Sequence, residues 1–129
     1  MNKNNYQLPL LTFLQAKRLK ELGFDWKVDN YFQLSADETV SRYRCNEATD
    51  VNNRYRDGRI SAPTIPLAIK WFRDVKKMYT DGGFYVPEKK WRFYYGQQSN
   101  ILQEQRTDEY ETYEEAERIL LEKLFEYKL

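Results

Sequence analysis

Residues 61–72 read SAPTIPLAIKWF, and this stretch carries the clearest local signals for secondary structure in the chain. Pro63 disfavours helical backbone angles at the residue before it, so a helix cannot begin earlier. Thr64 can act as an N-cap, and Pro66 falls in the first turn, where its missing N–H costs nothing. Apolar side chains then recur at helical spacing, at Ile65, Ala68, Ile69, Phe72, Val75 and Tyr79. With the DGG stop at 81–83, the pattern predicts a central core helix over about 65–79.

Downstream of this helix the apolar period becomes that of a strand. Segments 84–86 (FYV) and 91–96 (WRFYYG) flank the four residues PEKK, which predicts a β-hairpin. Alternation places Trp91, Phe93 and Tyr95 on one face of the second strand, and Arg92 and Tyr94 on the other. We assign the ring-rich face to the core. Arg92 and Tyr94 are therefore expected to face outward, beside the lysines of the turn.

An N-cap pattern predicts where the C-terminal helix begins. Thr112 opens the sequence TYEE, a capping-box pattern that predicts a helix running from there to the C-terminus. Between the hairpin and this helix, residues 101–105 are a candidate for a third strand of this half of the chain.

The N-terminal half shows a helix and two strands. Thr12 and Gln15 form a second capping-box pattern, which predicts a helix over about 12–22. The runs 31–34 and 40–45 contain ring and β-branched residues and are expected to be strands. The polar stretch 46–60 is expected to be a long surface loop.

These elements define the fold class. The order is α-β-β-α-β-β-(β)-α, with the strands grouped in hairpins, which favours α+β over a parallel sheet. A length of 129 residues fits one domain, 1–129. We predict three helices with one small antiparallel sheet of three to five strands.

The composition excludes most catalytic chemistry. The chain has no histidine and one cysteine, Cys45, which removes His-dependent nucleophilic catalysis and the usual zinc sites. Its five glycines are scattered, so no phosphate-binding loop or dinucleotide motif is present. Acidic residues cluster over 108–117. A metal site or an acid–base pair is the alternative interpretation, but these residues better suit the dipole of the helix expected there. We therefore expect no catalytic residue, no metal site and no cofactor, and predict that the protein is not an enzyme.

The cellular setting follows from similar observations. A single cysteine cannot form an intrachain disulfide, which favours a reducing compartment. No apolar run approaches the ~20 residues that span a bilayer. A net charge of +1 predicts neither general nucleic-acid affinity nor attraction to membranes. We expect a cytoplasmic protein with no membrane contact.

As a set, the motifs resemble those of a group of small uncharacterised proteins encoded by gut Bacteroidetes genomes, their prophages and their phages. In that group a Ser-Ala-Pro-Thr start introduces a Lys-Trp helix, followed by a Trp-containing strand and a closing helix. The matching positions are Ser61, Ala62, Pro63, Thr64, Lys70, Trp71, Arg73, Trp91, Tyr110, Thr112, Tyr113, Glu114, Glu115 and Ala116. The resemblance covers residues 61–129. It implies a phage or mobile-element setting, hence the cytoplasm of a host cell, and no catalytic residues.

The leading functional hypothesis is a non-enzymatic accessory or binding protein that acts through macromolecular contact, with a protein as the expected partner. Nucleic-acid binding is the alternative, because an α-β-β-(β)-α order also occurs in double-stranded-RNA-binding domains, a fold-level analogy. An enzyme using carboxylates or tyrosines ranks last. The candidate partner-binding residues are Trp71, Lys89, Lys90, Arg92 and Tyr94. The competing interpretation is that Trp71 packs under the 46–60 loop and that Tyr94 only covers a sheet face.

Overall fold

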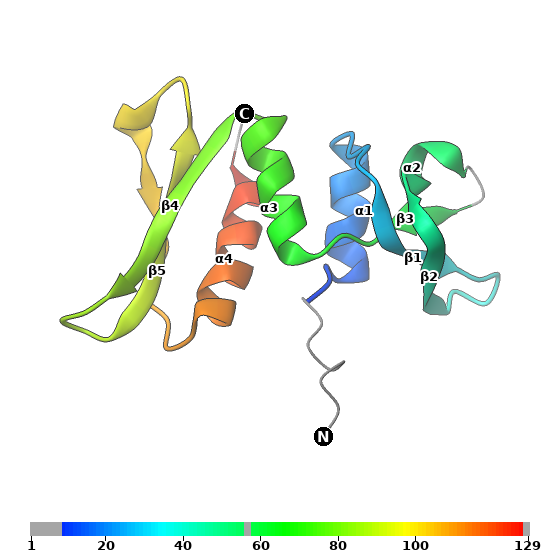
Figure 1. Cartoon of the computed structure of the whole chain (residues 1–129), viewed down its shortest axis with the longest axis horizontal. Helices are drawn as coiled ribbons and strands as arrows, with labels where there is room; N and C mark the ends of the chain where they lie inside the picture. The colour runs from blue at the N-terminus through cyan, green and yellow to red at the C-terminus, as the bar shows by residue number, and fades with distance from the viewer. Residues whose placement is uncertain (1–8, 56–57, 128–129) are drawn as a thin grey trace. The chain divides into compact units, whose positions relative to one another are not determined.

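The protein has an α+β fold in which two small antiparallel sheets are each accompanied by helices (Figure 1). The computed structural model describes residues 9–55 and 58–127. Contacts divide the chain into two compact units, Met1–Thr64 and Ile65–Leu129. The predicted elements follow in the expected order, but the described residues contain four α-helices and not three, and their strands form two sheets of three strands and not one sheet. That all 129 residues form one domain stays a prediction.

The N-terminal unit begins with helix α1 (Phe13–Glu21), which matches the predicted helix. The capping box is present: Thr12 Oγ1 accepts a hydrogen bond from the Gln15 N–H at 3.2 Å, and Gln15 Oε1 accepts one from the Thr12 N–H at 3.0 Å. Three antiparallel strands follow in the spatial order β2-β1-β3. They are β1 (Val28–Leu34), β2 (Val40–Thr49) and β3 (Arg59–Ser61).

The segment expected to be a long loop is structured over most of its length. Strand β2 continues to Thr49, and a short helix, α2 (Val51–Arg54), leads to β3. The Asn52 side chain organises this region, because its Nδ2 donates to the Phe24 carbonyl at 3.0 Å and its Oδ1 accepts from the Ser61 N–H at 2.8 Å. Hydrogen bonds to partners distant in sequence therefore order a stretch that has little apolar content of its own.

The C-terminal unit begins with helix α3 (Ile65–Asp74), which starts at the predicted residue. Its sheet has the order β4-β5-β6, with strands β4 (Met78–Tyr85), β5 (Lys90–Gln97) and β6 (Gln105–Arg106). A 3₁₀ turn, η2 (Ile101–Gln103), precedes β6, so the further strand lies slightly later than expected. Helix α4 (Tyr113–Glu126) closes the unit, with Thr112 accepting the Glu115 N–H as N-cap.

The end of α3 differs from the prediction. The helix stops at Asp74, Lys77 has a left-handed φ of 58°, and the chain enters β4 at the fully buried Met78. The DGG stretch therefore lies inside a strand, where Gly82 pairs with Phe93. A Cβ on Gly82 would come within 2.4 Å of a backbone oxygen of β5. The glycine allows close approach of two strands and does not terminate the helix.

The core of the C-terminal unit lies between α4, α3 and one face of its sheet. The Trp91 and Phe93 rings lie 5.2 and 5.9 Å from the ring of Tyr113 on α4. Phe72 of α3 contacts Phe125 of α4 edge-to-face at 5.4 Å. The prediction that the ring-rich face of β5 faces the core is thus confirmed. None of the described helices has the length and apolar character that crossing a membrane requires.

Candidate functional site

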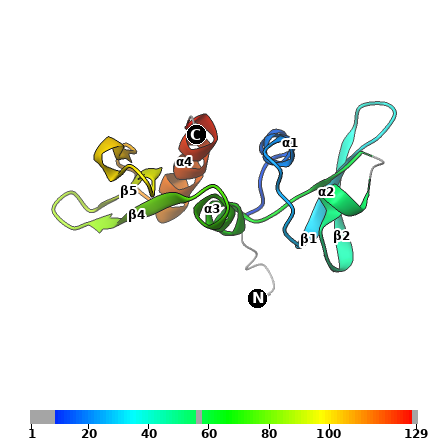
Figure 2. The same cartoon turned by 90° about the horizontal axis from the view of Figure 1, so that it is seen from above.

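The sheet of the C-terminal unit presents one face away from its helices. In both views α3 and α4 lie side by side next to β4 and β5 (Figures 1 and 2), and the residues that contact α4 are those on the ring-rich face. Cross-strand pairing places the remaining positions together on the opposite side. We call this side the outer face; it consists of Asp81, Gly83, Tyr85, Lys90, Arg92, Tyr94 and Arg106.

Arg92 occupies the centre of the outer face. Its guanidinium carbon lies 3.9 Å from the centroid of the Tyr85 ring and 5.7 Å from that of Tyr94. Its Nη1 lies 3.5 Å from Oε1 of Glu109, and only 16% of its side chain is exposed. Two ring contacts and an ion pair therefore restrict the orientation of this arginine.

The glycines of β4 create the space around Arg92. Gly83 is paired with Arg92, and a Cβ added at Gly83 would meet no atom within 4 Å. A shallow hollow of about 300 Å³ results, bounded by residues 81–85 together with Arg92 and Tyr94. The outer face is thus a concave surface with a planar cation and two phenol rings around it, a shape that suits a protruding side chain of a partner.

The structure brings together three of the five predicted site residues. Lys90, Arg92 and Tyr94 share the outer face, and Lys89 is exposed in the turn with a left-handed φ of 56°. Trp71, in contrast, is 1% exposed and contacts Phe72 edge-to-face at 5.4 Å. It is a core residue and lies away from the surface on which it was expected.

Tyr85 and Glu109 complete the site and were not among the predicted residues. The signal for Tyr85 was available, because alternation along β4 places it opposite to Phe84 and beside Arg92. Glu109 lies in the acidic segment for which the helix dipole was the preferred interpretation, and an ion pair with the sheet was not predicted. In the folded chain Glu109 pairs with Arg92, and Glu111 lies 3.7 Å from Lys90, so acids of this segment neutralise cations of the sheet.

Several tyrosines and the cysteine of the described chain have raised pKa values. Burial and the 2.7 Å hydrogen bond donated to Glu117 raise the pKa of Tyr113 to about 12. Burial also raises the pKa of Tyr95 and of the Cys45 thiol. These groups therefore stay protonated at neutral pH and are weak nucleophiles and bases. Within residues 9–55 and 58–127, no three His, Cys, Asp or Glu side chains are grouped so that they could hold a metal ion.

Comparisons of the chain with family models, with curated proteins and with solved structures give no match. The outer face offers ring surfaces, a planar cation and flanking charges of both signs. These groups are suited to molecular recognition.

Proposed function

We propose that this protein is a non-enzymatic accessory protein of a phage or mobile element, which binds a partner protein through the outer face of its C-terminal sheet. The observation that carries the proposal is the arrangement of Arg92, held between Tyr85 and Tyr94 and paired with Glu109. The phage setting, and with it the host cytoplasm, is supported by the resemblance of residues 61–129 described above.

Preorganisation is the physical basis of the proposal. Binding usually costs free energy because long side chains lose rotamer freedom at the interface, by about 0.5–1.5 kcal/mol for each one. The contacts of Arg92 with Tyr85 and Glu109 already restrict this side chain in the free protein. Arginine and tyrosine are also the residue types enriched among those that dominate interface energies.

The balance of charge on the outer face favours a protein partner over nucleic acid. Lys90 and Arg92 are matched by Glu111 and Glu109, and Asp81 lies on the same face. A surface that binds phosphate backbones needs cations without such compensation, since neutralised phosphates supply most of the binding energy. The C-terminal unit does have the order α-β-β-β-α, but the acidic segment that leads into α4 would repel an RNA backbone.

Affinity capture from host cells, with matched variants, tests the proposal. The full-length wild type, the double variant Arg92→Ala/Tyr94→Ala and the control Arg118→Ala are used as baits. Arg118 is exposed on α4, so its removal changes the charge equally without altering the outer face. Thermal melts establish that each bait is folded, and the captured protein is then purified and titrated against all three.

We expect wild type and Arg118→Ala to bind the purified partner equally, and the double variant to bind at least about tenfold more weakly, since interface hot spots contribute 2 kcal/mol or more. A folded double variant with wild-type affinity would show that the outer face is not the site. Capture of a nucleic acid through the same face would favour the alternative function.

A further inference from the structure

A small pocket lies on the inner side of the C-terminal sheet, opposite to the outer face. Its walls come from α3, α4 and the ring-rich side of the sheet, and its volume is about 150 Å³. Pockets that hold drug-sized ligands have volumes of roughly 300–1,000 Å³. The size therefore limits an occupant to one side chain or to a molecule of similar size. We call it the Glu117 pocket, and nothing in the proposal for the outer face involves it.

Most residues in the wall of the Glu117 pocket are apolar or aromatic. Ile69 of α3 and Leu120 of α4 are buried beside it. Phe93 of β5 and Tyr113 of α4 also line it, with their ring centroids 5.9 Å apart. Pro66, at the start of α3, is half-buried, so the pocket borders solvent on that side. Electrostatic interactions inside such a wall are stronger than in bulk water.

Glu117 places a carboxylate in this wall. Of the charged residues that the structure describes, Glu117 alone is buried, with 7% of its surface exposed. The Tyr113 hydroxyl, one turn earlier on α4, donates a hydrogen bond to its Oε2 at 2.7 Å. Within residues 9–55 and 58–127, no lysine or arginine pairs with Glu117. A carboxylate has about four acceptor positions, so these residues use only part of its hydrogen-bonding capacity.

Arg73 is the one cation among the described residues of the wall, and it is exposed on α3. Its positive charge opposes the binding of a second cation nearby. The buried carboxylate acts in the opposite direction, because a buried charge without a counter-charge costs free energy. The effect of Glu117 is the larger one, since solvent and salt screen the exposed guanidinium but not the buried acid.

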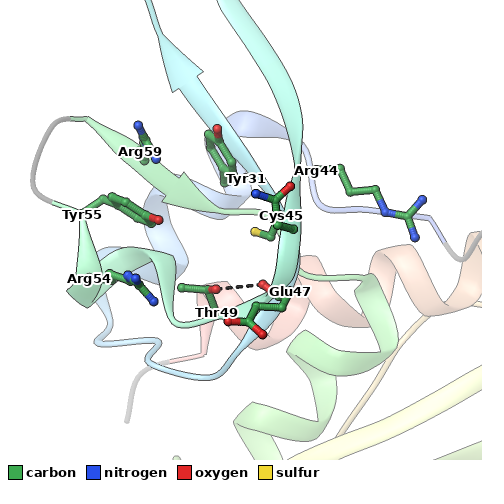
Figure 3. A pocket seen from close by; sticks show the side chains of 9 residues that line it. Tyr31, Arg44, Cys45, Glu47, Thr49, Arg54, Tyr55 and Arg59 are labelled. Carbon is green, nitrogen blue, oxygen red and sulfur yellow. Dashed lines mark hydrogen bonds between the residues drawn. The ribbon is translucent and has the colours of Figure 1, made fainter.

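A pocket on the N-terminal unit, shown in Figure 3, differs in this respect. Its rings are already covered, because the guanidinium carbon of Arg59 lies 5.3 Å from the Tyr31 centroid and 4.2 Å from that of Tyr55. Glu47, the carboxylate among its described lining residues, is exposed. A buried and only partly satisfied acid therefore distinguishes the Glu117 pocket.

We propose that the Glu117 pocket binds a primary alkylammonium group, with the ammonium on the Glu117 carboxylate and the alkyl chain against Ile69 and Leu120. Hydrogen bonds between a carboxylate and a charged donor are the strong ones. An ammonium is a compact charge that suits a small pocket, whereas a guanidinium is a wide planar fork. A lysine side chain of a partner polypeptide and a free amine present this same group.

NMR titrations of the full-length, isotope-labelled protein at constant ionic strength test this proposal. The probes n-butylammonium, 1-butanol and butyrate are similar in shape and differ in charge, and Nα-acetyl-lysine methylamide carries the ammonium on a polypeptide backbone. The variants are Glu117→Gln, whose amide oxygen can still accept the Tyr113 hydrogen bond, and Arg73→Gln. The matched control is Glu114→Gln, which removes the same charge from an exposed position on α4.

We expect the wild type to bind n-butylammonium with a millimolar dissociation constant, and more tightly than 1-butanol or butyrate. Glu117→Gln should weaken this binding at least about tenfold, because a charged hydrogen bond is lost, while Glu114→Gln has a much smaller effect. Arg73→Gln should strengthen it, because a like charge is removed. Tighter binding of the lysine derivative than of n-butylammonium would identify a partner's lysine as the ligand, and the reverse order would identify a free amine.

Several results would overturn the proposal. They are no spectral change with n-butylammonium at millimolar concentration, equal affinity for 1-butanol, equal affinities of Glu117→Gln and Glu114→Gln, and weaker binding by Arg73→Gln. The comparison of probes on the wild type and the exposed Arg73 variant remain decisive if Glu117→Gln is unstable. Each of these failures leaves the proposal for the outer face untouched, because the two sites lie on opposite sides of the sheet.

Discussion

Phe72 is the position at which the core of the C-terminal unit can be tested most directly. Its side chain is 1% exposed, and its ring makes edge-to-face contacts of 5.4 Å with both Trp71 and Phe125. Phe72→Ala removes the ring and leaves a cavity between α3 and α4. Substitutions of this kind lower the free energy of unfolding by about 3–5 kcal/mol. This cost is the sum of the transfer free energy of the buried atoms that are removed and the free energy of the cavity that remains.

Urea unfolding followed by circular dichroism measures this loss. The unfolding free energy of a small protein falls with urea concentration with a slope of about 2 kcal/mol per molar urea. A loss of about 4 kcal/mol therefore lowers the urea concentration at the unfolding midpoint by about 2 M. Val75→Ala is the matched control, since Val75 follows α3 and is 44% exposed, so its truncation is expected to cost little.

A Phe72→Ala variant within about 1 kcal/mol of wild type would refute the core assignment, because surface substitutions have effects of that size. An unchanged slope in both variants is required for the comparison, since a changed slope indicates a different denatured state or a loss of two-state unfolding.

Three further outcomes follow from the structure. Gly82→Ala places a Cβ 2.4 Å from a backbone oxygen and is expected to lower the unfolding free energy by about 1–3 kcal/mol, whereas Gly83→Ala, whose Cβ meets open space, should be neutral or stabilising by up to about 1 kcal/mol; equal melts would contradict the close approach of β4 and β5. The pKa of Tyr113 is raised to about 12, so the stabilisation from its protonated hydroxyl is complete below about pH 10 and is lost as the pH rises through about 12. Phenolate absorbance during alkaline titration measures this. Tyr113→Phe should reduce the late-titrating phase without abolishing it, because the pKa of Tyr79 is also raised to about 12. Cys45→Ser and exhaustive chelation should both leave capture of the partner protein unchanged. Loss of capture after either treatment would indicate that partner binding requires the thiol or a metal ion.

Sequence patterns located the elements whose signals lie within a few residues of each other. The start of α3 at Ile65, the N-caps Thr12 and Thr112, and the hairpin of β4 and β5 were all predicted and are confirmed. The orientation of β5 was also predictable, because strict alternation assigns every side chain to one of two faces once the ring-rich face is known to be buried.

Features that depend on distant partners were decided by the tertiary structure. The end of α3 depended on Met78 entering a strand paired with β5, which outweighed the helical spacing of Val75 and Tyr79. Trp71 was predicted to bind a partner, but it is buried, because local spacing cannot show how far packing extends around a helix.

The candidate site shows the same division. Alternation along β5 was enough to identify Arg92 and Tyr94. The pairing of β4 with β5 adds Tyr85, and the segment between β6 and α4 brings Glu109 next to Arg92. The contact of Arg59 with the Tyr31 ring in the N-terminal unit joins residues far apart in sequence, so no local pattern could predict it. Periodicity and capping act over one or two turns of chain, so the sequence by itself determined the elements and their faces. Which side chains meet across strands is a matter of register and topology, and only the folded chain decided it.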